Sequence, residues 1–222
     1  ILSIFLILSL AACLDQDTLP YIPPVTRKSN NINITVDPRV ELVSIVQYLS
    51  QYNQLMTEAN FSYRSDVDQY FDQYRDHEAI TMYDKMAKMG FIFSSPATFA
   101  LGLTDSLFMD DDVLIPTHIL SGSGGKDQLK DFSQALRDFS RTSNFSGFYN
   151  EHQDYYRENL LQVFTFLEQR DYDTEVQNYF GMEYNSFNVL PVPLYGGGGG
   201  FGPNVERGDS VDAYCILIPF DD

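Results

Sequence analysis

Tryptophan is absent from the sequence, and cysteine occurs at only two of its 222 positions. So few cysteines exclude a disulfide-stapled scaffold, and no C-x-x-C pair indicates a zinc knuckle or a redox motif. Basic residues are also scarce, since 14 Lys and Arg stand against 31 Asp and Glu, for a formal net charge of -17. This balance argues against nucleic acid and anionic lipid as partners, because both require a basic surface. No apolar run reaches the ~20 residues that a membrane-spanning helix needs.

The first residues have the layout of a secretory signal. An apolar stretch over residues 1–10 leads into Leu10-Ala11-Ala12-Cys13, which resembles the bacterial lipobox, whose cysteine thiol takes a diacylglycerol. We expect residues 1–12 to be a signal peptide with a truncated start and Cys13 to be the lipid attachment site. Residues 13–31 would then tether the protein to a membrane of the bacterial cell envelope, on its periplasmic or outer surface. An ordinary signal peptide with a cysteine near its end is the alternative.

Hydrophobic residues make up 44% of the chain, enough for a core, and their spacing predicts one mainly helical α+β domain over residues 32–222. After a short β-type run at 33–36, Asp or Ser before Pro marks helix starts and Gly marks helix ends. About seven helices are expected, at 37–49, 65–75, 77–89, from residue 95, and at 126–141, 147–169 and 173–180, with loops at 110–112 and 121–125.

The last part of the chain changes character, from helical spacing to strands. Strands are expected at 187–194, which its prolines restrict to a sheet edge or a bulge, and at 213–219. The helical body is therefore expected to lead into a β-hairpin or small sheet. Because the last strand lies so near residue 222, we expect the domain to be incomplete at its C-terminus.

Four ordered segments carry a resemblance to a known family. They are DPRVELVSIVQY at 37–48; Tyr70-Phe71 with Asp76-His77 and Gly90-Phe91; FSRTSNF at 139–145 followed by FYNEH at 148–152 and Tyr155-Tyr156; and YGGGGGFGP at 195–203. From about residue 33 to 222, the sequence resembles a bacterial family of secreted or lipid-anchored proteins described only as a domain of unknown function. Its members are predicted to be gluzincin-like zinc metallopeptidases.

The resemblance implies zinc-dependent peptide hydrolysis for the complete protein. In that family a His-Glu-x-x-His motif follows soon after the strand at this chain's C-terminus, and its two His bind zinc while its Glu acts as general base. This sequence lacks the motif, so no catalytic residue, metal ligand or cofactor is assigned to it. We expect it to be the N-terminal part, a scaffold and substrate-cleft wall that is inactive alone. The alternative is a non-catalytic surface lipoprotein that binds glycan or protein through its Tyr-rich helices.

The glycine run at 196–202 is the most unusual feature of the sequence, and it allows two interpretations. It can be a flexible hairpin turn. The resemblance instead implies an edge strand whose backbone at Gly198, Gly199, Gly200 and Gly202 pairs with an extended peptide or protein substrate, because glycine permits close approach.

The remaining candidates for chemistry are expected to be structural. His77 lies near a helix start, His118 is expected to pack and His152 to be solvated, and the three are too far apart in sequence to predict a zinc site. Cys215 lies inside an apolar run and is expected to be a small buried hydrophobe rather than a nucleophile.

Overall fold

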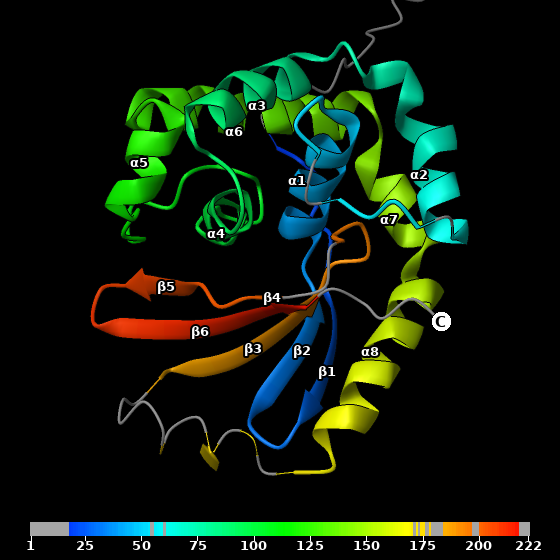
Figure 1. Ribbon diagram of the computed structural model, residues 1–222, viewed down its shortest axis with the longest axis vertical. Coiled ribbons are helices and arrows are strands. Elements are labelled where there is room, and N and C mark those ends of the chain that lie inside the picture. The colour runs from blue at the N-terminus through cyan, green and yellow to red at the C-terminus, as the bar shows by residue number, and fades with distance from the viewer. Residues whose placement is uncertain are drawn as a thin grey trace, which may run out of the picture.

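The computed structural model describes residues 18–53, 56–59, 61–170, 172, 174–175, 178, 184–196 and 200–217. The predicted α+β class is confirmed, since a mainly helical body packs against a six-stranded mixed sheet (Figure 1). The described elements are β1 (Val25–Ser29), β2 (Ile32–Val36), α1 (Pro38–Leu49), α2 (Ser62–Phe71), the short 3-10 helix η1 (Asp72–Tyr74), α3 (Glu78–Met89), α4 (Ser95–Leu101), α5 (Thr117–Ser123), α6 (Lys126–Thr142), α7 (Phe145–Glu151), α8 (Gln153–Leu167), β3 (Ser186–Pro191), β4 (Gly200–Phe201), β5 (Asn204–Arg207) and β6 (Ser210–Leu217).

The sheet combines strands from the two ends of the described chain. Its order is β1-β2-β3-β6-β4, and β5 also pairs with β6. The β1–β2 hairpin is antiparallel, β2–β3 and β3–β6 are parallel, and β4 and β5 both run antiparallel to β6. Parallel neighbours require a long connection, and here the whole helical body connects β2 to β3.

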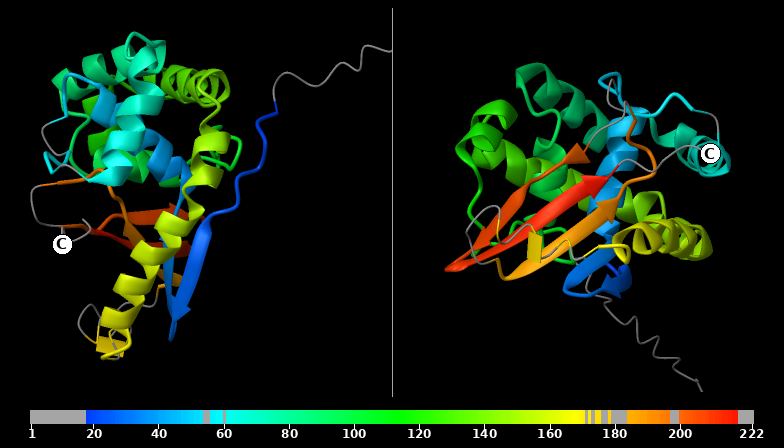
Figure 2. Two further views of the ribbon diagram at one scale, coloured as in Figure 1. Left: turned by 90° about the vertical axis from the view of Figure 1, so that its right-hand side faces the viewer. Right: turned by 60° about the horizontal axis from the view of Figure 1, so that its bottom comes forward.

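Helices cover the sheet unequally. Figures 1 and 2 show α8 running alongside β1 and β2, while the other helices gather at one side of the sheet. Arg27 in β1 is aligned with Ile34 in β2, and its guanidinium carbon lies 3.9 Å from the ring centroid of Phe164 in α8. Because cross-strand partners share a face, α8 covers the face that carries Ile34. No helix among the described residues is long and apolar enough to cross a bilayer.

The helix α1 lies at the centre of the helical body. It begins as predicted, with the Asp37 carboxylate accepting from the backbone N–H of Arg39 at 2.9 Å and Pro38 in the first turn. Every residue from Val40 to Leu49 is buried, as in a helix surrounded by others on all sides. Its neighbours are α3, α4 and α6.

Three predictions of helices were wrong in part. The helix α2 begins at Ser62, before the expected capping sequence, and has no side-chain cap. The helix α5 takes in part of the segment predicted as a loop, because Gly122 packs tightly on Gly90: a Cβ atom on Gly122 would lie 2.9 Å from the Gly90 carbonyl oxygen. The single helix predicted at 147–169 is two helices, α7 and α8, which meet at His152.

Two predictions about the strands also need correction. The tether predicted to run to residue 31 overlaps β1, whose chain reverses at Asn30 (φ 51°) to pair with β2. The strand β3 is internal rather than at an edge, since it lies between β2 and β6. Pro191 is its last residue, so the missing N–H falls at the strand end, where a proline is tolerated. The helix predicted at 173–180 lies largely outside the described residues.

Candidate functional site

The predicted peptide-pairing glycines fall at one edge of the sheet. Gly200 and Gly202 lie in the described part and are exposed, while Gly198, Gly199 and the predicted lipid site Cys13 lie outside the described residues. The strand β4 pairs antiparallel with the Ile216–Leu217 end of β6. Among the described strands β6 is its one neighbour, so the other side of β4 is an edge. An edge of this kind can pair with an extended chain.

The two glycines of this edge differ in what surrounds them. A Cβ atom on Gly200 would lie 2.8 Å from the carbonyl oxygen of Ile216, so the pairing of β4 with β6 itself requires glycine there. A Cβ atom on Gly202 would find its nearest neighbour, the Tyr214 carbonyl oxygen, at 3.9 Å. Packing within the described chain therefore explains Gly200 but leaves room for a side chain at Gly202.

The far end of the same edge is covered by the loop that follows α4. The backbone N–H of Leu114 donates to the carbonyl oxygen of Glu206 at 3.0 Å, and Val113 forms a bridge with Arg207. The Arg207 guanidinium also lies 3.5 Å from the Asp110 carboxylate, which ties this loop to β5. The open part of the edge is thus the β4 end, next to the glycine run.

A buried amide holds the chain that leads into the glycine run. The Tyr195 hydroxyl donates to Oε1 of Gln47 in α1 at 2.7 Å, and Nε2 of Gln47 donates to the Tyr83 hydroxyl of α3 at 3.1 Å. Burial raises the pKa of Tyr195, and it raises the pKa of Tyr83 to about 12. The backbone N–H of Thr57 donates to the Leu194 carbonyl oxygen at 2.8 Å. Residues 194–195 are therefore fixed to both α1 and the 56–59 segment.

A second polar cluster surrounds Glu41, for which the sequence predicts no role. Glu41 is 1% exposed, and its carboxylate accepts from the hydroxyl of Tyr63 in α2. That hydroxyl lies 2.8 Å from the hydroxyl of Tyr156 in α8. Burial raises the pKa of Glu41 to about 7, against the opposing effect of the Tyr63 hydrogen bond. The available signal in the sequence is an acidic residue between Val40 and Leu42 in an otherwise apolar run.

The histidines do not form a metal site. Nδ1 of His77 accepts from the backbone N–H of Ala79 at 3.1 Å and so caps α3. His152, predicted to be solvated, lies 3.2 Å from the Asp66 carboxylate, and His118, predicted to pack, is exposed. Within the described ranges, no three His, Cys, Asp or Glu side chains gather to hold a metal ion. The described His, Cys, Asp and Glu side chains therefore do not offer a zinc ion a set of ligands.

Cys215 is exposed, so its predicted burial was wrong. It is aligned with Val189 of β3 on the face that α8 covers. The helix α8 contacts β1, β2 and β3, and β6 lies one strand further on, which explains why the thiol side of Cys215 remains open.

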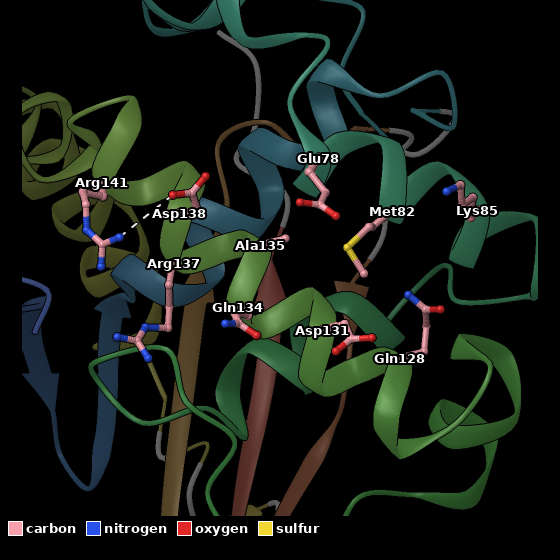
Figure 3. Close-up of a pocket in the computed structure, with 10 residues that line it drawn as sticks. All are labelled: Glu78, Met82, Lys85, Gln128, Asp131, Gln134, Ala135, Arg137, Asp138 and Arg141. Atoms are coloured by element: carbon pink, nitrogen blue, oxygen red, sulfur yellow. Dashed lines mark ion pairs between the residues drawn. The ribbon is translucent and has the colours of Figure 1, made fainter. Parts of the chain in front are cut away.

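A groove of about 520 Å³ lies between α3 and α6, on the helical body rather than at the sheet edge (Figure 3). Its charges are mixed, with Glu78 and Lys85 from α3 facing Asp131, Asp138 and Arg141 from α6. Asp138 and Arg141 pair with each other at 3.9 Å. Such a balanced lining does not select an anion or a cation, so the groove adds nothing to the candidate site.

The tyrosines of the helices mostly point inward. Tyr63, Tyr83, Tyr149 and Tyr156 are each at most 1% exposed, and of the described tyrosines only Tyr21, which precedes β1, is classed as exposed. Buried rings cannot stack on a sugar, so this arrangement offers little platform for a glycan.

Comparisons with known proteins identify a family and no function. The model of the family described as Domain of unknown function (DUF4932) matches residues 32–221. No curated protein matches the sequence, and no solved structure matches it.

Proposed function

The chain belongs to this family of unknown function, and from that premise we propose that it is the N-terminal scaffold of an envelope-anchored zinc metallopeptidase. In this proposal the β4 edge forms one wall of the peptide cleft. The chain is inactive alone, and Cys13 anchors it to the membrane through a lipid. The zinc ligands are proposed to come from residues that follow Asp222, since the described residues do not fit the metal.

The observation that supports a peptide-binding wall is the different environment of the two edge glycines. Gly200 is required by β6, but Gly202 is exposed with space above it. Glycine costs conformational entropy on folding, and packing within the described chain gives no reason to keep it at Gly202. A substrate backbone that approaches closely supplies that reason, and main-chain hydrogen bonds to the edge supply affinity without dependence on side chains.

Firm anchoring of the preceding residues also supports this assignment. A cleft wall has to hold its hydrogen-bonding groups in place before the substrate arrives, because ordering them on binding reduces affinity. Tyr195 is held by Gln47, and Leu194 by Thr57, immediately before the glycine run. The alternative function, glycan binding by helical tyrosines, gains no comparable support.

The first test is the coding sequence beyond Asp222. A His-Glu-x-x-His motif within the next several dozen codons is the expected result. A stop codon, or a long continuation without the motif, would contradict a peptidase and favour a non-catalytic binding protein.

The second test uses the complete protein with Gly202→Ala and Gly202→Val. We expect kcat/KM for peptide hydrolysis to fall with side-chain size, by about tenfold or more for Val, the equivalent of about one net hydrogen bond. Ser210→Val is the matched control, because Ser210 is an exposed β6 residue that pairs with Arg207 at the covered end. Unchanged turnover in Gly202→Val would remove β4 from the cleft. Gly200→Val is unsuitable, since it collides with Ile216.

A further inference from the structure

The Glu41 carboxyl lies where three helices meet. Glu41 comes from α1, its hydrogen-bond partner Tyr63 from α2, and Tyr156, which contacts Tyr63 at 2.8 Å between hydroxyls, from α8. All three side chains are at most 1% exposed. This buried hydroxyl–carboxyl contact links α1 to α2 and, through the neighbouring Tyr156 hydroxyl, to α8.

Of these helices α2 depends most on the cluster. It buries only Tyr63, Val67 and Phe71, and no side chain caps its N-terminus. By contrast, α1 is buried along nearly its whole length, and α8 is held by three strands of the sheet. The other polar contacts of α2 with α1 are only partly buried: the Tyr48 hydroxyl donates to Asp68 and Nε of Arg64 donates to Tyr48, each at 2.9 Å. The Glu41–Tyr63 contact is fully buried, so a charge at Glu41 acts on α2 where water cannot screen it.

In the described part of the chain, no cationic side chain acts on the Glu41 carboxyl to neutralise it. The nearby titratable groups are all tyrosine hydroxyls, and a charge on Glu41 raises the pKa of each of them. They are Tyr63 of α2, Tyr149 of α7, Tyr156 of α8 and Tyr195 after β3. An ionised carboxylate in such a place is desolvated without a counter-charge, which is strongly unfavourable. The neutral carboxylic acid carries no charge, so its burial is much less costly.

One further titratable pair lies behind Tyr63. The His152 ring centroid is 5.2 Å from that of Tyr63, and His152 pairs with Asp66 of α2. Because His152 contacts Tyr63, an experiment has to separate its effect from that of Glu41.

We infer that the Glu41 carboxyl is a proton-operated latch, which holds α2 against α1 and α8 when protonated and releases it when ionised. The 56–59 segment precedes α2, and its Thr57 donates a backbone hydrogen bond to Leu194. Release of α2 therefore also frees this segment. Control of peptide binding by this route rests on the proposed function; the latch itself does not, and its test uses no substrate.

The test is amide hydrogen exchange on the chain of residues 1–222, with rates corrected for the intrinsic effect of pH. Burial raises the pKa of Glu41 from its ordinary value of 4.5 to about 7. Taking the ordinary value for the released state, proton linkage predicts that protection of α2 falls about 30-fold between pH 5.5 and pH 8.5. Amides of α6 serve as the internal reference and are expected to change much less. In Glu41→Gln, which mimics the neutral acid, the α2 decrease is expected to disappear.

Two variants keep the inference testable should Glu41→Gln fold poorly. Tyr63→Phe removes the hydrogen bond that lowers the pKa of Glu41, so the midpoint of the α2 transition should move to higher pH. His152→Gln removes the neighbouring histidine and should leave the transition in place. Four results would overturn the inference. The wild type could show no transition, or α6 could show the same transition. The midpoint could stay unchanged in Tyr63→Phe, or the transition could disappear in His152→Gln. An intact transition in this chain, together with a complete protein that hydrolyses no peptide, would count against the proposed function alone.

Discussion

Removing one hydroxyl from the buried Gln47 cluster should destabilise the whole domain. In Tyr195→Phe the ring stays and the donor to Oε1 of Gln47 is lost. Gln47 is 2% exposed, so water cannot readily replace that donor. Leaving a buried acceptor unsatisfied lowers the free energy of unfolding by about 1–3 kcal/mol. Removing a hydroxyl that is exposed to water changes it very little. We expect a loss of about 2 kcal/mol in the free energy of unfolding.

The assay is urea unfolding followed by far-UV circular dichroism, with linear extrapolation to water. Tyr21→Phe is the matched control, because the Tyr21 side chain is 63% exposed, and its midpoint should equal that of the wild type. Gln47→Leu leaves the hydroxyls of both Tyr195 and Tyr83 without their partner, so a larger loss of about 3 kcal/mol is expected.

The double variant of Gln47→Leu and Tyr195→Phe decides whether the hydrogen bond is the cause. Once Gln47 is gone, deleting the Tyr195 hydroxyl removes an unsatisfied group and should cost nothing further, so the double loss should fall short of the sum by about 2 kcal/mol or more. Strictly additive losses would refute the reasoning, because they would mean that the two side chains contribute independently through packing.

Two other changes test the fold and the anchor. Gly122→Ala should lower the free energy of unfolding by about 1–3 kcal/mol, because its Cβ would lie 2.9 Å from the Gly90 carbonyl oxygen and overpacking outweighs the helix preference of alanine; equal midpoints in urea would contradict this. Cys13→Ala should abolish incorporation of a labelled fatty acid into the protein in bacterial cells, and labelling equal to that of the wild type would exclude a lipid anchor at Cys13.

Local signals in the sequence predicted the elements whose ends are set by near neighbours. Asp37 caps α1 through Arg39, and Gly90 ends α3 at φ 110°, and both interactions stay within one helical turn. The helix α5 also ends at a left-handed glycine, Gly124 at φ 92°, but its Ser- and Gly-rich composition is typical of a loop. A tertiary contact between Gly122 and Gly90 accompanies the helix there, and local patterns do not encode that contact. The internal position of β3 depends on pairing with β2 across the length of the helical body, which local patterns do not encode.

The candidate site was predictable only as a segment. The glycine run stands out in the sequence, yet the difference between Gly200 and Gly202 depends on where the Ile216 carbonyl of a later strand lies. Glu41 shows the same limit. Its presence in an apolar run is visible, but its partner is settled by helix packing. An arginine would lower the pKa of Glu41 strongly, whereas here burial outweighs the Tyr63 hydrogen bond and raises the pKa.

Three of the buried tyrosines serve the polar residues of α1. This helix is buried on all sides, yet it carries Glu41 and Gln47, whose polar atoms require partners in the middle of the core. Both obtain them from tyrosines, Glu41 from Tyr63 and Gln47 from Tyr83 and Tyr195. A tyrosine fills the core as phenylalanine does and adds one hydroxyl for such a contact. The helix α1 thereby contacts α2 through Glu41 and the chain that leads into β4 through Gln47, so a change at Gln47 acts directly on Tyr195, just before the glycine run.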